Sequence, residues 1–306
     1  MIRLPVISGA RRPGTRRLPS WLKRPLPAGE EFARTRKVVS ASAVSTVCRE
    51  ARCPNVGECW SKRHATFMIL GSKCTRRCLF CAVTTARPAP PEADEPRRLA
   101  EAVAELRLSH VVITAVSRDD LADEGAAHFA ACVRAVRRAA PETTIEVLPA
   151  DFHARRDCIA TLLAGGPDLY NHNLETVERL TPTVRPQADF GRSLEVLRVV
   201  KSIDPGMLTK SGLMVGLGET GDELLAAFAA LRAVGCEVLT IGQYLCPTRE
   251  GCLPVVKFYT PDEFDELGRS ARAMGFVSVS AGPFVRSSYN AAEVFARTGK
   301  ARTSCK

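Results

Sequence analysis

Hydrophobic positions between residues 66 and 280 follow two alternating patterns. Short, unbroken apolar runs indicate strands buried on both faces, and apolar residues at intervals of three or four indicate helices. The pattern predicts strands at 66–71, 109–116, 144–148, 168–172, 212–215, 237–242 and 276–280. It predicts helices between them at 96–108, 123–140, 155–164, 190–203, 222–234 and 261–274.

This alternation predicts a parallel sheet covered by helices, which either a barrel or a doubly wound sheet would produce. Polar residues follow four of the strands, at 117–120, 171–175, 216–220 and 243–244. A barrel builds its site from the loops after many strands, whereas a doubly wound sheet gathers the site at one switch point. We therefore expect an α/β fold in which residues 66–282 form a partial (β/α)6 TIM-like barrel, with extensions at both ends.

The amino-terminal tail differs from the rest of the chain in charge. Residues 1–29 hold seven basic residues and no acidic one, and the remaining residues carry 36 basic against 33 acidic side chains. Positive charge confined to an arm gives little support for nucleic-acid binding, which needs a basic folded face. No apolar run approaches the roughly 18 residues of a membrane span. We expect no nucleic-acid or membrane partner and a cytoplasmic location; the alternative is an Arg-rich transit peptide at residues 1–17 that directs the chain to a mitochondrial or plastid matrix.

Six of the twelve cysteines fall within residues 48–81. They form two triads: the first has the spacing C-x3-C-x2-C and follows the first predicted strand (Cys74, Cys78, Cys81), and the second, in the extension at 30–65, has the spacing C-x4-C-x5-C (Cys48, Cys53, Cys59). Disulfide frameworks belong mainly to short secreted chains, so the length of this chain disfavours them. Structural zinc takes four closed ligands, so triads with this spacing disfavour a zinc site. Three thiolates suit three corners of a four-iron cluster and leave one iron open for reactive chemistry.

Other motifs give weaker signals. Residues 216–221 match G-x-G-x-x-G, but no carboxylate ends the following strand, so we interpret them as a tight glycine turn at the barrel mouth. His172 lies in a strand-end motif and is a candidate to line the site, whereas His110 and His128 are expected to pack or lie at the surface. Cysteines 132 and 158 lie on predicted helices and are expected to behave as small buried hydrophobes.

The two cysteine spacings, together with Arg-Ser-Ser-Tyr-Asn-Ala at 286–291, resemble the lipoyl synthase family of the radical S-adenosylmethionine superfamily. The resemblance extends from about residue 18 to residue 292 and includes motifs at 117–121, 171–176, 209–220 and 242–245. The sequence departs from the family pattern at 247–255, where Gly251 and Cys252 stand in place of a common histidine. No role is therefore carried over to that loop.

This resemblance implies a set of cofactors and a reaction. The cofactors would be two [4Fe-4S] clusters and S-adenosylmethionine, which binds the open iron of the cluster on the first triad. One electron would release a 5′-deoxyadenosyl radical that takes hydrogen from C6 and then C8 of an octanoyl chain on a carrier lysine. The second cluster would donate the two sulfur atoms. A cofactor is needed for this reaction, because side-chain acids and bases cannot cleave unactivated C–H bonds.

The same resemblance implies partners. These would be octanoylated lipoyl carrier domains (the E2 subunits of 2-oxoacid dehydrogenases and the glycine cleavage H protein), an electron donor such as ferredoxin or flavodoxin, and an iron–sulfur carrier that rebuilds the second cluster. Two alternatives remain: an electron-transfer module, which would have four cysteines per cluster, and another two-cluster radical enzyme that inserts sulfur or modifies RNA.

Further site residues are expected near both clusters. The resemblance assigns Ser288 as the fourth ligand of the second cluster, with Ser287, Cys305 or a simple serine turn as alternatives. Serine oxygen is a harder ligand than thiolate and suits a cluster that must open. The segment 283–306 is expected to fold back across the barrel mouth and close the site. We expect Asn171, Asn173 and Glu175 to contact S-adenosylmethionine, the alternative being an Asn-rich turn that caps the next helix.

Overall fold

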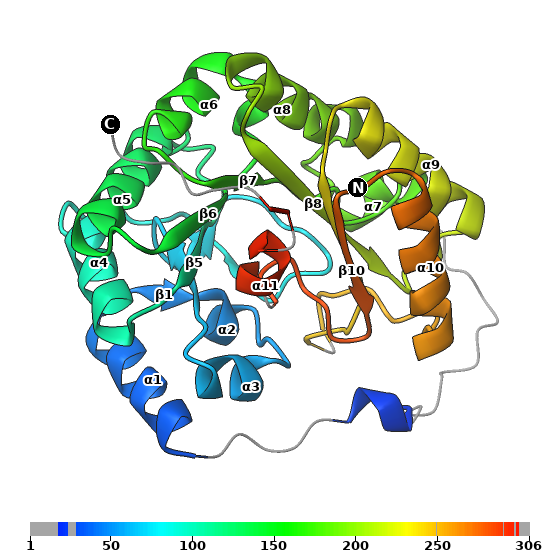
Figure 1. The fold of residues 1–306 in the computed structure, drawn as a ribbon, viewed down its shortest axis with the longest axis horizontal. Coiled ribbons are helices and arrows are strands. Elements are labelled where there is room, and N and C mark those ends of the chain that lie inside the picture. Colours follow the sequence, from blue (N-terminus) through cyan, green and yellow to red (C-terminus); the bar gives the residue numbers. More distant parts are fainter. Residues whose placement is uncertain (1–17, 24–28, 249, 290, 297, 300–306) are drawn as a thin grey trace, which may run out of the picture.

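The computed structural model describes residues 18–23, 29–248, 250–289, 291–296 and 298–299 (Figure 1). Most of the basic tail, including the transit-peptide candidate at 1–17, lies outside these residues, and so does Cys305. Across the described ranges, none of the helices combines the length and apolar character that a bilayer crossing requires.

Seven parallel strands in chain order form one sheet, and an eighth strand extends it antiparallel at one edge. The order across the sheet is β1 (Ser45–Thr46), β2 (Thr66–Ile69), β5 (His110–Ala115), β6 (Thr144–Leu148), β7 (Leu169–Asn171), β8 (Leu208–Val215), β9 (Val238–Gln243) and β10 (Ser278–Gly282). β3 (Lys73–Cys74) and β4 (Thr84–Thr85) pair separately. The sheet curves into an incomplete ring, so the expected partial barrel is confirmed (Figure 1).

Helices cover the outer face of the ring (Figure 1). The covering helices are α4 (Glu95–Leu106), α5 (Ala126–Ala139), α6 (Arg156–Leu163), α8 (Phe190–Ile203), α9 (Gly221–Ala233) and α10 (Pro261–Ala273). Three short helices lie in the connections between these elements: the 3-10 helices η2 (Phe152–Ala154) and η3 (Glu178–Leu180), and α7 (Thr181–Val184). Both α9 and α10 begin with a capping box, in which Thr220 or Thr260 and the glutamate three residues later satisfy the first backbone N–H groups.

The alternating elements lie close to the predicted ranges, and the largest differences are in where some of them begin. α5 begins at Ala126, three residues after its predicted start at 123. β8 begins at Leu208, four residues before the predicted start, because Thr209, Lys210 and Ser211 are polar but fully buried inside the barrel. β10 begins at Ser278, two residues later than predicted. The glycine turn after β8 is as interpreted, since Gly216 and Gly218 both have φ of +107°.

The amino-terminal extension is more helical than its turn-rich sequence suggests. It forms α1 (Glu30–Ala41), α2 (Val47–Glu50) and α3 (Val56–Ser61), after the short η1 (Ser20–Leu22). Phe32 of α1 packs on Trp60 of α3 with ring centroids 5.7 Å apart, and Thr35 donates to the Trp60 carbonyl at 2.9 Å. These contacts fix α3, which carries one cysteine of the second triad.

The described part of the carboxyl-terminal segment (283–289, 291–296 and 298–299) runs into the barrel, and the expected closure of the mouth stays a prediction. Residues 285–288 line the interior of the barrel. The helix that follows, α11 (Ala291–Ala296), packs Val294 and Phe295 against the first residues of β7, β8 and β9. These residues mark the end of the barrel opposite the strand-end loops, and Figure 1 shows α11 inside the ring. The apolar side chains of α11 explain this course, because they fill the bottom of the barrel.

Candidate functional site

The first triad lies on a loop at residues 74–81, between β3 and β4. Backbone N–H groups of Arg76 and Ser117 donate to Cys74 Sγ at 3.4 Å, and that of Val83 donates to Cys81 Sγ at 3.4 Å. Burial raises the pKa of the Cys81 thiol to about 12. The Cys81 sulfur therefore becomes a thiolate only where a metal replaces the proton.

Arg76 anchors this loop to the barrel. Its buried guanidinium lies 2.8 Å from Asp151 and donates to Asp119 at 2.9 and 3.0 Å. Thr75 donates to the same Asp119 carboxylate at 2.6 Å. Burial alone would raise the pKa of Asp119, but the hydrogen bonds from Arg76 and Thr75 keep it lowered. The loops that follow β5 and β6 therefore hold the first-triad loop in place through Asp119 and Asp151.

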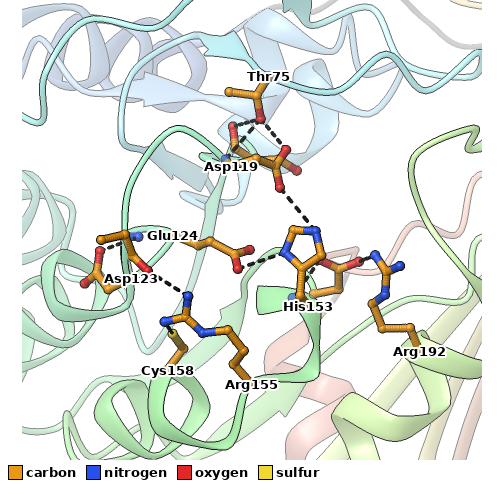
Figure 2. A network of polar contacts seen from close by, with 12 residues as sticks. Thr75, Asp119, Asp123, Glu124, His153, Arg155, Cys158 and Arg192 are labelled. Carbon is orange, nitrogen blue, oxygen red and sulfur yellow. Dashed lines mark hydrogen bonds and ion pairs between the residues drawn. The ribbon is translucent and has the colours of Figure 1, made fainter.

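His153 extends this network (Figure 2). Its Nδ1 lies 2.9 Å from Glu124, and its Nε2 lies 4.0 Å from Asp119. Residues Phe152, His153 and Ala154 have φ of +45°, +46° and +56°, a left-handed conformation that costs roughly 1–2 kcal/mol per residue for side chains with a Cβ. The polar contacts around His153 oppose that cost and hold the turn beside Asp119.

The second triad lies in the amino-terminal extension: Cys48 is on α2, Cys53 follows it, and Cys59 is on α3. Burial raises the pKa of Cys48 to about 11 and that of Cys59 to about 12. All three cysteines line one pocket together with Ser288, and we call it the second-triad pocket. The sequence places Ser288 more than 200 residues away, so only the fold brings the four donors together.

Contacts between the two chain ends build this pocket. Asn55 donates to the Phe284 carbonyl at 2.6 Å, and the Tyr289 hydroxyl lies 2.8 Å from Glu58. Ser287, the alternative to Ser288, accepts a hydrogen bond from Asn173 at 2.7 Å and is not in the wall of the second-triad pocket.

A central cavity of about 550 Å³ connects the two triads. Its wall includes all three cysteines of the first triad, and also Cys53 and Ser288 from the second-triad pocket. Apolar side chains form another part of the wall (Phe80, Val116, Leu148, Leu213, Met214). A long apolar chain can therefore lie between two sulfur-rich sites.

The structure separates the three expected contacts of S-adenosylmethionine. Asn173 and Glu175 line the central cavity, whereas Asn171 does not. The Asn173 amide donates to Glu175 at 2.9 Å, and its Oδ1 has no hydrogen-bond partner in the described part of the chain. Burial raises the pKa of Glu175, although Arg185 opposes the shift. The helix-cap alternative does not apply, because the next turn is capped by Val177 without a side-chain hydrogen bond.

Asn171 belongs to a polar layer inside the barrel that the sequence analysis missed. It donates to Glu146 at 2.7 Å, and Lys210 lies 2.9 Å from the same carboxylate. The Nε2 of His110 lies 3.3 Å from Glu146, so His110 is neither at the surface nor in an apolar contact alone. Two charged residues in the sequence could have revealed this layer. Glu146 lies inside the predicted strand 144–148, and Lys210 lies two residues before the predicted strand 212–215.

Other predicted residues have structural positions that agree with expectation. His172 lines the central cavity. Cys132 and Cys158 are buried. His128 lies 2.7 Å from Glu95 on the outer helical layer. Arg185 and Asp151, which also line the cavity, were not identified from sequence because nothing in their local pattern marks them.

Both sites fit iron–sulfur clusters by the chemistry of their donors. Each offers three cysteine sulfurs, the usual protein ligands of such clusters, and the second offers a serine oxygen as well. All eleven cysteines in the described ranges are free thiols, so none of these donors is used in a disulfide. The Asn173 oxygen without a partner and the acidic Glu175 provide polar contacts beside the first triad.

Solved structures confirm the fold. The chain is similar to the FeFe-hydrogenase maturase HydG from Carboxydothermus hydrogenoformans (TM-score 0.58, 14% identity, 81% of this chain and 56% of that chain covered). It is also similar to coproporphyrinogen III oxidase from Escherichia coli, described as a radical SAM enzyme (TM-score 0.50, 13% identity, 70% and 54% covered). The family model for the radical SAM superfamily matches residues 68–231. The fold and the first triad thus place the chain among radical S-adenosylmethionine proteins.

Closer sequence relatives narrow this class. The model for the N-terminal domain of lipoyl synthase matches residues 9–53, which include two cysteines of the second triad. A lipoyl synthase from Rubrobacter xylanophilus is 53% identical over 90% of this chain and 85% of its own length. Another from Methylococcus capsulatus is 52% identical, with 93% and 88% covered. The chain belongs to the lipoyl synthase family.

Proposed function

We propose that this protein inserts two sulfur atoms, at C6 and C8, into an octanoyl chain bound to a carrier lysine, as a radical S-adenosylmethionine sulfurtransferase. The family assignment makes the chain a lipoyl synthase with S-adenosylmethionine and [4Fe-4S] clusters as cofactors. The observation that carries the proposal is the single cavity lined by all three cysteines of the first triad and by Cys53 and Ser288 of the second-triad pocket. When bound, these cofactors supply the radical that takes hydrogen and the sulfur that replaces it.

In this proposal, Cys74, Cys78 and Cys81 hold the cluster that binds S-adenosylmethionine. Arg76 fixes their loop through Asp119 and Asp151, and the three cysteines on the cavity wall would hold a cluster that supplies an open iron to S-adenosylmethionine. Asn173 and Glu175 orient the amino-acid and ribose groups of S-adenosylmethionine, because they lie on the cavity wall at the strand ends. Asn171 takes a structural role instead, through Glu146.

Cys48, Cys53, Cys59 and Ser288 hold the sulfur-donating cluster in the proposal. Contacts from Asn55 and Tyr289 keep Ser288 beside the cysteines. The apolar wall excludes water and aligns the octanoyl chain, so that its target carbons face both clusters. We divide the chain accordingly into a basic tail (1–29), an extension carrying second-cluster ligands (30–65), the barrel (66–282) and a carboxyl-terminal segment that completes the site (283–306).

Lipoyl carrier proteins are the partners that the family assignment supports. Within that class we propose the E2 subunits of 2-oxoacid dehydrogenases and the glycine cleavage H protein. Ferredoxin or flavodoxin as reductant, and an iron–sulfur carrier for rebuilding the second cluster, stay predictions. A cytoplasmic location also stays a prediction, supported by bacterial relatives.

The test is an anaerobic reaction of the reconstituted full chain with an octanoyl-lysine peptide, S-adenosylmethionine and a low-potential reductant. Mass spectrometry should show replacement of two hydrogens by two sulfurs, with about two equivalents of S-adenosylmethionine cleaved, one for each hydrogen removed. A peptide with unmodified lysine serves as the control and should gain no sulfur. Cleavage of S-adenosylmethionine without sulfur in the octanoyl peptide would contradict the proposal.

A further inference from the structure

His110 is a buried residue of the second-triad pocket to which the proposed function gives no role. It is the first residue of β5, and its side chain is 3% exposed. The wall of the pocket contains His110 together with the three cysteines and Ser288. The imidazole therefore borders the place that the second cluster would occupy.

Buried charges determine which nitrogen of His110 carries a proton. Nε2 lies 3.3 Å from Glu146, and Lys210 Nζ lies 2.9 and 3.1 Å from the two oxygens of that carboxylate. Paired in this way with the Lys210 ammonium, the Glu146 carboxylate is the acceptor for both of its neighbours. An ionised carboxylate only accepts hydrogen bonds, so Nε2 must be the N–H side of the ring.

Nδ1 of His110 is therefore the nitrogen left for another partner. It is buried and has no hydrogen-bond partner among the residues that the structure describes. An unpartnered buried polar atom costs about 1–3 kcal/mol, so a partner from the pocket is expected. A histidine that donates one N–H to a carboxylate and offers its other nitrogen is the usual arrangement at a metal, and iron accepts imidazole.

We propose that His110 Nδ1 is an alternative terminal ligand for the iron that Ser288 holds in the second-triad pocket. This inference rests on the proposed function, because it requires the second cluster to occupy that pocket. In the exchange, the bond between serine oxygen and iron breaks and a bond between Nδ1 and iron forms. The serine oxygen takes a proton from water, and no electron leaves the iron.

Such a ligand exchange gives a role to the buried ion pair of Lys210 and Glu146 in the polar layer inside the barrel. Removing Lys210 and Glu146 from water is costly, and pairing them does not by itself guarantee stability. Lys210 holds the Glu146 carboxylate, and Glu146 alone contacts the imidazole, so the pair directs Nε2 toward the carboxylate and leaves Nδ1 for another partner. A site that gives up sulfur gains a way to retain its iron while Ser288 is released.

The experiment uses the full chain with Cys74, Cys78 and Cys81 replaced by alanine, so that only the second cluster remains. Three variants are made in this background: Ser288→Ala, Ser288→Ala with His110→Gln, and Ser288→Ala with His64→Gln. His64 also borders the pocket and is the matched control. Iron content and pulsed EPR of the reduced cluster are measured in protein labelled with ¹⁴N- or ¹⁵N-histidine.

The Ser288→Ala variant should retain about four irons per chain, one cluster, and show a nitrogen coupling of the size of a direct iron–histidine bond. The coupling should change with the isotope, persist with His64→Gln and vanish with His110→Gln. A chelator should remove iron at least tenfold faster from the variant with Ser288→Ala and His110→Gln than from the variant with Ser288→Ala alone. Because the isotope effect in Ser288→Ala alone tests the bond, the result does not depend on the folding of the His110 variant.

Two results would overturn the inference: the absence of histidine coupling in Ser288→Ala, or a coupling that disappears only with His64→Gln. If the triple-alanine background holds no iron even with Ser288 present, the proposed second-cluster site fails instead. The two failures are therefore distinguishable.

Discussion

The two cysteine triads are similar in chemistry and different in construction. The first triad lies on one short loop, and its anchors come from the ends of neighbouring barrel strands: Asp119 follows β5 and Asp151 follows β6. The second triad depends on contacts between opposite ends of the chain. Its two supporting hydrogen bonds join residues 229 and 231 positions apart, Asn55 with Phe284 and Glu58 with Tyr289.

This difference matters for how each site opens. The first-triad loop shares its ion pairs with the barrel, so displacing it means breaking contacts of a buried guanidinium, which costs several kcal/mol. The contacts described between the segment that carries Ser288 and the amino-terminal extension include two hydrogen bonds, Asn55 to Phe284 and Tyr289 to Glu58, each worth about 0.5–3 kcal/mol. A site that is used repeatedly and a site that is consumed and rebuilt would need these two kinds of support.

Removing the first triad should have the largest effect. Replacing Cys74, Cys78 and Cys81 by alanine should lower iron from about eight to about four per chain and reduce cleavage of S-adenosylmethionine to background, because no open iron remains. Iron analysis and chromatography of the cleavage products measure both effects. Unchanged cleavage would show that the cofactor binds elsewhere.

Removing the second triad should separate the two activities. With Cys48, Cys53 and Cys59 replaced by alanine, we expect cleavage of S-adenosylmethionine to continue while no sulfur reaches the octanoyl peptide. Only the second cluster is assigned to donate atoms. Cys132→Ala, a buried cysteine on α5, is the control and should retain both activities. Joint loss of both activities would mean that the triads do not work separately.

Asn171, the last residue of β7, and Asn173, two positions later, should respond differently to replacement by alanine. Asn173→Ala should weaken S-adenosylmethionine binding about tenfold, the equivalent of one lost hydrogen bond to a charged group, with little change in thermal stability. Asn171→Ala removes a donor from buried Glu146 and should lower the free energy of unfolding by about 1–3 kcal/mol with binding retained. Calorimetry and thermal unfolding distinguish them; equal binding loss in both variants would contradict the assignment.

Single hydrogen bonds at each triad should give the smallest effects. Tyr289→Phe removes the hydroxyl that contacts Glu58 and should speed iron loss from the second cluster about threefold to tenfold, while the first cluster is unaffected. Thr75→Val is the matched variant, since it removes a contact with Asp119 and should act on the first cluster alone. Chelator-driven iron release followed by EPR reports both rates. If Tyr289→Phe releases iron from both clusters equally, the two supports are not independent.

Local patterns in the sequence determined the architecture and the cysteine chemistry. Apolar runs and helical spacing located the barrel elements because those signals arise within ten or twenty residues, and α8 has the predicted limits, 190–203. The spacing of Cys74, Cys78 and Cys81 predicts a cluster loop for the same reason, since three donors on one loop need no distant partner.

Tertiary structure decided which polar residues share a site. Lys210 interrupts an apolar pattern, and its burial becomes favourable only beside Glu146, 64 positions away. The choice between Ser287 and Ser288 is also tertiary, because Asn173 engages Ser287 and leaves Ser288 in the pocket of the second triad. The second-triad pocket exists because the amino-terminal extension meets residues 284–289, and no local spacing encodes a contact between residues that are more than 200 positions apart.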